Sequence, residues 1–195
     1  MTNYCGNDGI AGCQFTLFPM SDQFVDIILS ALDEVDTSNV WKDTDDVSTT
    51  VRGDLAHVFD VVKAIYLHAV KTGEHVAMSG TFSIGCPGDT PEHVKEVTTN
   101  ELKNESTSKQ ISQKAGCKFA LYPMGHENYM DLIVEQIDLS NSRGVEVSSS
   151  HYATRLDGEV NDIFRAMEEA FIQVNKRANH VTMTFTISAN SPSNR

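Results

Sequence analysis

The sequence is built from two copies of one pattern, and this duplication constrains its fold more than any other feature. Residues 11–20, AGCQFTLFPM, return as residues 115–124, AGCKFALYPM, at an offset of 104. After one extra residue near His126 the offset becomes 105, and it then holds without a gap to Pro87 in the first copy and Pro192 in the second. The duplication predicts two structural units of the same kind within the 195 residues.

Each copy shows hydrophobic patterns whose period changes along the chain. Alternating apolar and polar residues are typical of a strand, whereas apolar residues three and four apart are typical of a helix. In the first copy these patterns predict a strand over 13–18 that ends at Pro19, a helix over 24–32 with Ser21 as candidate N-cap, a hairpin of 40–44 and 47–52, a helix that begins near Gly53-Asp54, and a last strand over 76–84.

The second copy repeats this order, with a helix over 129–137, a hairpin of 145–149 and 151–156, a helix after Gly158, and a last strand over 181–188. The order β-α-β-β-α-β belongs to the ferredoxin-like fold, in which both helices cover one face of an antiparallel sheet. We therefore predict an α+β fold of two tandem ferredoxin-like βαββαβ repeats with antiparallel sheets, over residues 1–87 and 115–195. Residues 88–114 are rich in polar side chains and predict a solvated linker, with room for a short helix around Asn100 to Asn104.

The sheet face turned away from the helices is predicted to be polar but uncharged. In the last strand of the second copy this face carries three threonines and a serine, Thr182, Thr184, Thr186 and Ser188. Such a face suits packing against another sheet or a ligand platform. Duplicated units of this kind pair their sheets or edges, within one chain or across a dimer.

Composition and charge exclude several classes of function. With 15 Lys and Arg against 27 Asp and Glu, the formal net charge is −12, and a negative surface repels the phosphates of nucleic acids. The longest apolar runs are shorter than the roughly 18 residues of a membrane span, and no secretory signal is visible. We expect a cytoplasmic protein without membrane insertion. Its four cysteines form no C-x-x-C pair and are expected to be reduced thiols: Cys5, Cys13, Cys86 and Cys117.

Residues that could support catalysis recur in both copies but lack partners. His75 and His180 match across the copies, yet neither has a carboxylate, Cys or second His at ligand spacing, so hydrogen bonding in a turn explains them better than general-base or metal chemistry. Cys13 and Cys117 also match, and a thiol in the middle of a strand is usually inert packing. We predict that the protein is not an enzyme, holds no metal and needs no cofactor.

Four stretches, FTLFPM at 15–20, GTFSIGCPGD at 80–89, FALYPM at 119–124 and SANSP at 188–192, resemble the YkoF family of thiamine and hydroxymethylpyrimidine-binding proteins. The resemblance spans both repeats. It implies a homodimer of paired ferredoxin-like repeats that binds thiamine or its hydroxymethylpyrimidine moiety, one site per repeat, without turnover. It also implies a link to the uptake or salvage of thiamine precursors.

The same resemblance points to Leu17 and Thr49 as ligand-binding residues in the first repeat, and to Leu121 and Thr154 in the second. Thiamine joins an aminopyrimidine to a positively charged thiazolium. Its site needs an apolar slot, a few polar groups for the pyrimidine edge, and no fixed positive charge near the thiazolium. Without the resemblance, a Leu and a Thr in strands are more simply explained as core and ordinary β-sheet residues.

The predicted hairpins differ between the copies. Asp46 and Ser48 of the first become His151 and Ala153 in the second. If the hairpins border the pockets, Ser48 and His151 are further ligand-binding candidates, and the two sites differ in affinity because one offers a carboxylate and the other a titratable imidazole. Exposed hairpin tips also diverge freely without any role in binding.

Two further classes of function remain open. One is a regulatory or scaffolding module that binds a protein partner, and the other is a hydrolase or salvage enzyme. A binding protein should retain unmodified ligand, a scaffold should gain no stability from small molecules, and an enzyme should form product with time.

Overall fold

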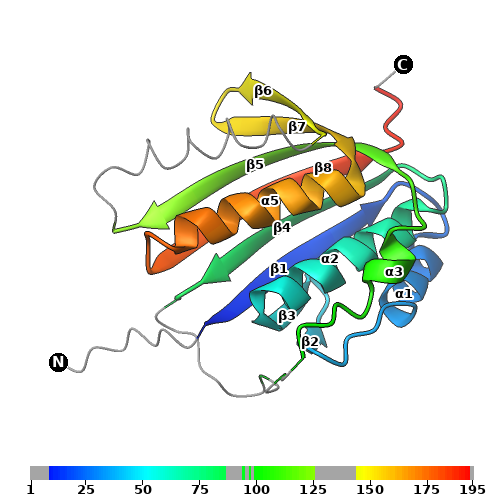
Figure 1. Cartoon of the computed structure of the whole chain (residues 1–195). Helices are drawn as coiled ribbons and strands as arrows, with labels where there is room; N and C mark the ends of the chain where they lie inside the picture. The colour runs from blue at the N-terminus through cyan, green and yellow to red at the C-terminus, as the bar shows by residue number, and fades with distance from the viewer. Residues whose placement is uncertain (1–8, 87–93, 95–96, 98, 126–143, 194–195) are drawn as a thin grey trace.

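Eight strands form one continuous sheet in the order β2-β3-β1-β4-β8-β5-β7-β6 (Figure 1). The computed structural model describes residues 9–86, 94, 97, 99–125 and 144–193. Within these residues the elements are β1 (Ile10–Pro19), α1 (Phe24–Asp33), β2 (Trp41–Thr44), β3 (Thr49–Asp54), α2 (Leu55–Val70), β4 (Val76–Ile84), α3 (Glu105–Ser108), β5 (Lys114–Met124), β6 (Glu146–Ser150), β7 (Ala153–Glu159), α5 (Val160–Asn175) and β8 (His180–Ala189).

The two repeats join through their last strands. β4 pairs with β8 in antiparallel register from Val76↔Ala189 to Ile84↔Val181. On either side of this junction the strands follow the same order, β2-β3-β1-β4 in the first repeat and β6-β7-β5-β8 in the second. The predicted fold of two tandem ferredoxin-like repeats is confirmed, although the helix predicted over 129–137 lies outside the described residues.

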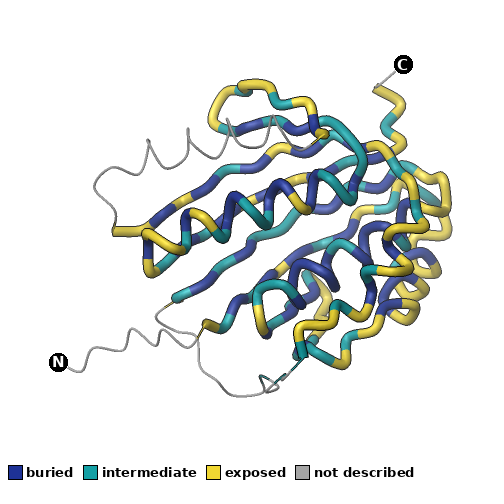
Figure 2. Tube along the Cα trace, viewed as in Figure 1, coloured by how far each residue is buried: buried dark blue, intermediate teal, exposed yellow. Residues whose placement is uncertain are grey.

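All the described helices lie on one face of the sheet, and α2 and α5 run side by side across its centre (Figure 1). Burial alternates along the strands, as Figure 2 shows. In β8, for example, Met183 and Phe185 are buried beneath the helices, whereas Thr184 and Thr186 are exposed on the opposite face. This face, which we call the open face, is polar as expected, but it is not uncharged, because Lys118 pairs with Thr186 and Arg155 pairs with Lys118 on it.

An aromatic cluster connects the two repeats beneath α2 and α5. Phe59 of α2 stacks on Phe82 of β4 with ring centroids 4.0 Å apart. Phe82 in turn lies 5.2 Å from Phe185 of β8, and Phe164 of α5 lies 6.2 Å from the same ring. Phe59 and Phe164 hold equivalent positions and are 2% and 1% exposed. The hydrophobic core is therefore continuous across the junction, which favours association of the repeats.

Two glycines of the stretch 80–89 are explained by close packing between the repeats. A Cβ atom on Gly80 would lie 2.8 Å from Cβ of Phe15 and 2.9 Å from Cε1 of Phe185. Gly85 has a φ angle of +76°, and a Cβ there would lie 1.9 Å from the carbonyl oxygen of Asn179. Neither position can accept a side chain without moving the backbone around it.

The helix starts agree only partly with the sequence patterns. α1 begins at Phe24 and has Gln23 as its N-cap, so the prediction of Ser21 as N-cap is wrong. Ser21 instead holds the preceding turn, because its hydroxyl accepts a hydrogen bond from the Gln23 amide at 3.3 Å and its carbonyl accepts one from the Phe24 amide at 3.2 Å. α2 begins directly after Asp54, whose carboxylate accepts a hydrogen bond from the Ala56 amide at 3.0 Å.

The described end of the linker packs against the helices. Asn104 is 4% exposed and Ser108 is fully buried, so the prediction of a solvated linker is wrong for these residues. The Asn104 side-chain amide donates to the Asp36 carbonyl at 2.9 Å and to the Asp60 carboxylate at 2.9 Å. These buried bonds fasten the linker to the first repeat. The short helix begins at Glu105, so its predicted position around Asn100 to Asn104 lies too early in the chain.

Candidate ligand-binding pocket

A pocket of about 520 Å³ lies between β1, α1 and the tip of the β2–β3 hairpin, and we call it the first-repeat pocket. Leu17, Ser48 and Thr49 line it together. Its volume is in the range of small-molecule sites. The three ligand-binding residues predicted for the first repeat are thus brought to one place by the fold.

The two strands that carry Leu17 and Thr49 are neighbours in the sheet. Thr49 pairs with Phe15 across β1 and β3, and Leu17 follows two residues later on the same face of β1. Thr49 is 6% exposed, and its hydroxyl shares a hydrogen bond with the hydroxyl of Thr44 at 3.1 Å. Because a hydroxyl has one donor and two acceptor positions, Thr49 keeps capacity for a ligand.

The tip of the hairpin is held in place by Asp45. Its carboxylate accepts hydrogen bonds from the backbone amides of Ser48 and Val47, both at 2.8 Å. These bonds lower the pKa of Asp45. The Thr16 hydroxyl also donates to the Val47 carbonyl at 2.9 Å and ties the tip to β1. Asp45 therefore positions Ser48, a role that the sequence analysis missed although an Asp that begins a polar turn is a signal for it.

The walls of the first-repeat pocket are mostly apolar, and its charge is negative. Asp46 is the one charged side chain among the described residues that line it. Such a carboxylate, without a lining Lys or Arg beside it, favours a ligand of positive charge.

Helix α1 supplies an apolar wall of the first-repeat pocket. Ile27, Ala31 and Leu32 are buried, but Phe24 is 51% exposed and borders the pocket together with Ile28. The apolar residues of the predicted helix over 24–32 were the available signal, and the sequence analysis used them only to predict a helix.

In the second repeat, Leu121 and Thr154 hold the same register. Thr154 pairs with Phe119 and Leu121 with Met183, as Thr49 pairs with Phe15 and Leu17 with Met78. His151 lies exposed in the turn of the β6–β7 hairpin, with its ring centroid 6.3 Å from that of Tyr152. The helix predicted over 129–137 lies outside the described residues, so a second pocket around Leu121, Thr154 and His151 stays a prediction.

His75, Cys13 and Cys117 occupy structural positions. The Nε2 atom of His75 shares a hydrogen bond with the hydroxyl of Ser188 across the β4–β8 junction at 3.0 Å. Cys13 and Cys117 are buried, and burial raises the pKa of both thiols. In the described part of the chain, no group of three or more His, Cys, Asp or Glu side chains is arranged to hold a metal ion.

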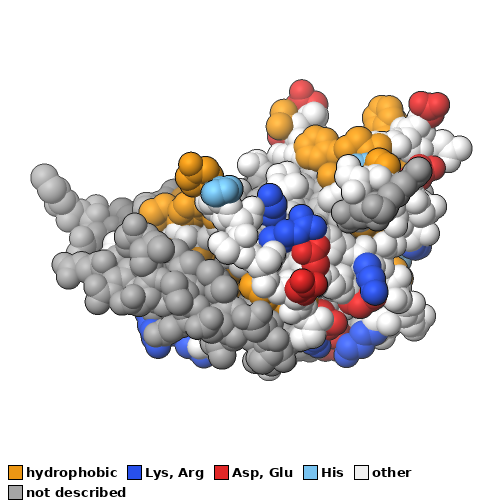
Figure 3. Space-filling view, turned by 90° about the horizontal axis from the view of Figure 1, so that it is seen from above, with side chains coloured by type: hydrophobic (Ala, Val, Ile, Leu, Met, Phe, Trp, Pro, Cys, Tyr) orange, Lys and Arg blue, Asp and Glu red, His pale blue; other side chains and the backbone are white. Residues whose placement is uncertain are grey.

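The open face is hollowed along its centre. A groove of about 540 Å³ runs there over β1, β4, β8 and β5, and residues of both hairpins border it, Val47 from the first and Tyr152 from the second. Figure 3 shows hydrophobic side chains gathered along the side of the molecule away from the helices. Exposed aromatic residues on this face include Phe18 and Tyr122.

Comparison with known proteins agrees with the duplicated architecture. The family model described as "YKOF-related Family" matches residues 10–89 and 114–194, which are the two repeats. The chain belongs to the YKOF-related family. A relative of this YKOF-related chain, YkoF of Bacillus subtilis (strain 168), is 46% identical over 195 residues, which are 100% of this chain and 98% of the relative. The name of that relative gives it, provisionally, as an HMP/thiamine-binding protein, where HMP is hydroxymethylpyrimidine.

Solved structures resemble this YKOF-related chain over shorter spans. A hypothetical protein of Methanocaldococcus jannascii is 20% identical with a TM-score of 0.37, and the match covers 38% of this chain and 78% of the other. A protein of Streptococcus pneumoniae is also 20% identical, with a TM-score of 0.34 and coverage of 38% and 83%. Among the described helices of the YKOF-related chain, none is long and apolar enough to cross a membrane.

Proposed function

We propose that the protein binds thiamine or its hydroxymethylpyrimidine moiety reversibly, without chemical turnover and without a cofactor. The observation that carries the proposal is the convergence of Leu17, Ser48 and Thr49 on one apolar pocket. The name of the 46% identical Bacillus relative supports the same class of ligand. A cytoplasmic location and a role in the uptake or salvage of thiamine precursors belong to the same proposal.

The first-repeat pocket matches the two halves of thiamine. The apolar wall of Phe24 and Ile28 suits a flat ring, and burial of the ring contributes favourable free energy. The hydroxyls of Thr49 and Ser48 can donate to and accept from the pyrimidine edge. Asp46 lies at the exposed hairpin tip and would attract the positive thiazolium.

We propose one site in each repeat, with unequal affinities. Leu121 and Thr154 share the register of Leu17 and Thr49, whereas His151 takes the place of Asp46 at the hairpin tip. A protonated imidazole repels a thiazolium, so the second site should bind a cation more weakly at acidic pH.

We further propose a homodimer in which a second copy covers the open face. Its hydroxyl-rich central strands and the exposed Phe18 and Tyr122 suit packing against an identical sheet, because a twofold axis places the same patch on both partners. Sedimentation velocity at micromolar concentration checks this, and a monomer under those conditions would contradict it.

Calorimetric titration with thiamine tests the sites. Thr49→Val keeps the side-chain shape and removes the hydroxyl, so it should weaken one of two sites by about 0.5 to 1.5 kcal/mol, or about 2- to 12-fold. Thr154→Val should weaken the other site alone. Thr50→Val is the matched control, because Thr50 adjoins Thr49 in β3 but faces the other side of the sheet.

The possible results separate the three classes of function. If neither Thr49→Val nor Thr154→Val changes the thiamine affinity of either site, the pocket is elsewhere. A single site per chain would contradict the two-site proposal. Mass spectrometry of ligand recovered after long incubation should show unchanged thiamine, whereas a cleaved or phosphorylated product would indicate an enzyme. Absence of heat and of thermal stabilisation by thiamine and hydroxymethylpyrimidine would favour a scaffolding module.

A further inference from the structure

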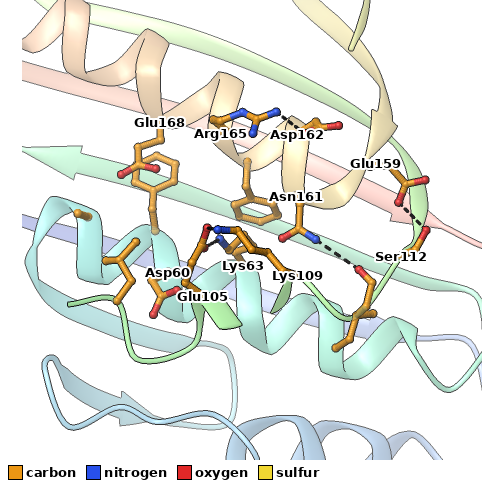
Figure 4. A pocket seen from close by; sticks show the side chains of 15 residues that line it. Asp60, Lys63, Glu105, Lys109, Ser112, Glu159, Asn161, Asp162, Arg165 and Glu168 are labelled. Carbon is orange, nitrogen blue, oxygen red and sulfur yellow. Dashed lines mark hydrogen bonds and ion pairs between the residues drawn. The ribbon is translucent and has the colours of Figure 1, made fainter. Parts of the chain in front are cut away.

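A second cavity, of about 540 Å³, lies on the helical side of the molecule between α2, α5 and the segment around α3. Apart from Phe59 and Phe164 at its apolar base, it is lined largely by polar and charged side chains, several of which point toward one another in Figure 4. None of the described residues lines both this cavity and the first-repeat pocket. We call it the interhelix cavity.

Each cationic side chain of the interhelix cavity has a carboxylate partner. The Lys63 ammonium lies 2.6 Å from one carboxylate oxygen of Glu105, and the Lys109 ammonium lies 3.0 Å from the other. Arg165 pairs with Asp162. Among the described lining residues, Lys63 and Lys109 thus share Glu105, and Arg165 is paired with Asp162.

Asp60 is the most deeply buried acid of the cavity. It is 3% exposed, and its Oδ2 atom accepts hydrogen bonds from the backbone amide of Asn104 at 3.0 Å and from the Asn104 side chain at 2.9 Å. Its Oδ1 atom has no hydrogen-bond partner among the described residues. A buried carboxylate oxygen without a donor is costly, so this atom favours a ligand that supplies one.

Asn161 presents a second acceptor of the same kind. Its side-chain nitrogen donates to the carbonyls of Ser108 at 3.0 Å and Ile111 at 3.3 Å, which fixes the orientation of the amide. The Oδ1 atom of Asn161 is buried and has no partner in the described part of the chain. The unsatisfied atoms on the cavity wall are thus acceptors.

Glu168 adds a further carboxylate from the opposite helix. Burial is the largest of the effects that bring its pKa to about 7. The positive charge of Lys63 lowers the pKa, whereas the negative charges of Glu105, Asp60 and Glu169 raise it. Glu168 thus lies within electrostatic range of Asp60 although the two residues come from different repeats. A cation between them would favour the charged form of both carboxylates.

The cavity depends on the tandem arrangement. At the offset of 105 residues, Asp60 of α2 corresponds to Arg165 of α5, and Lys63 corresponds to Glu168. Equivalent positions around the crossing of the helices therefore carry opposite charges. Neither repeat contains the set of acceptors by itself, so the site can form only where α2 and α5 of one chain meet.

We propose that the interhelix cavity binds a small organic cation with several N–H donors, a primary ammonium or an amidinium, between Asp60, Asn161 and Glu168. Carboxylates bind such groups through charge-assisted hydrogen bonds, which compensate for the loss of water. The volume of the cavity suits a small molecule. The absence of a cluster of three metal-ligating side chains among the described residues favours an organic cation over a metal ion.

Titration followed by amide NMR shifts tests this proposal, with 1,4-diaminobutane as the ammonium probe and benzamidine as the amidinium probe. At least one of them should saturate a single site per chain, with shifts centred on α2 and α5. Tetramethylammonium, which has charge but no donor, and 1,4-butanediol, which has donors but no charge, should each bind at least tenfold more weakly. Equal binding of either control would overturn the proposal.

Two variants locate the site. Glu168→Gln, which keeps the shape of the side chain, should weaken binding of the better probe at least tenfold, and Asp60→Asn should do the same if its circular dichroism and melting curve remain those of a folded protein. Glu74→Gln, at an exposed turn outside the residues that line the cavity, is the matched control and should leave probe binding unchanged. Binding that survives Glu168→Gln and Asp60→Asn, or no saturation by either probe, rules the site out.

Thiamine is itself an organic cation, so the two sites must be separated. Glu168→Gln should retain the thiamine titration of the wild type, and saturating thiamine should leave the affinity for the better probe within twofold. Displacement of the probe by thiamine would contradict a separate site. Displacement by magnesium at millimolar concentration would identify a metal site and would also overturn the proposal.

Discussion

At the scale of single residues, Glu168 makes a clear prediction about the pH dependence of stability. Its pKa is about 7 in the folded protein, against 4.5 for an unperturbed side chain. The folded state therefore holds this proton more tightly than the unfolded state does. The contribution of Glu168 to the free energy of unfolding is fully present below pH 4.5. It is lost as the pH rises through 7, and the total loss is about 3 kcal/mol at most.

Glu168→Gln removes this dependence, because glutamine does not ionise. Relative to the wild type, the variant should gain stability between pH 4.5 and pH 7, as measured by urea unfolding at a series of pH values. Glu74→Gln, at an exposed turn, is the control and should give a curve parallel to that of the wild type. A parallel curve for Glu168→Gln would show that Glu168 is ionised at little cost in the folded protein.

At the scale of elements, α2 and α5 are equivalent helices whose N-caps differ. The Asp54 carboxylate accepts a hydrogen bond from the Ala56 amide at the start of α2, whereas Glu159 makes no side-chain cap bond at the start of α5. Asp54→Ala should therefore lower the free energy of unfolding by about 1 kcal/mol, and Glu159→Ala by clearly less. Chemical denaturation of the two variants checks the comparison, and equal losses would contradict the assigned role of Asp54.

At the scale of the whole molecule, the pairing of β4 with β8 joins the two repeats into one continuous sheet. Gly80 lies in this junction, and a Cβ atom there would meet backbone as well as side chain, since the Gln14 carbonyl oxygen would be 2.9 Å away. Gly80→Ala should destabilise the protein by about 1 to 3 kcal/mol and speed hydrogen exchange in both β4 and β8.

Gly12→Ala is the matched control for this prediction. A Cβ on Gly12 would lie 3.6 Å from its nearest neighbours, which is ordinary contact, so the free energy of unfolding should change by less than about 0.5 kcal/mol. If Gly80→Ala proves equally harmless, the strands at the junction can separate more easily than their close packing indicates.

The sequence alone determined the architecture, because a duplication with alternating strand patterns and two amphipathic helices per copy leaves few other solutions. It also placed Leu17 and Thr49 in the candidate site through the resemblance of short motifs to a family, and Ser48 through the divergence of the predicted hairpins. It misplaced the cap at Ser21 and the solvation of Asn104, since both depend on which backbone groups become buried. The polarity of the local sequence does not predict which of these backbone groups become buried.

Only the tertiary structure decided how the repeats join and what lies between them. Pairing of β4 with β8 brings α2 and α5 together, and this contact gathers Asp60, Asn161 and Glu168 from segments about 100 residues apart. A pattern of apolar residues fixes which face of each element is buried, but it carries no information on which edge of the sheet meets which. Sites formed between repeats follow from that choice of edge, whereas sites within one repeat follow from its local order of strands and helices.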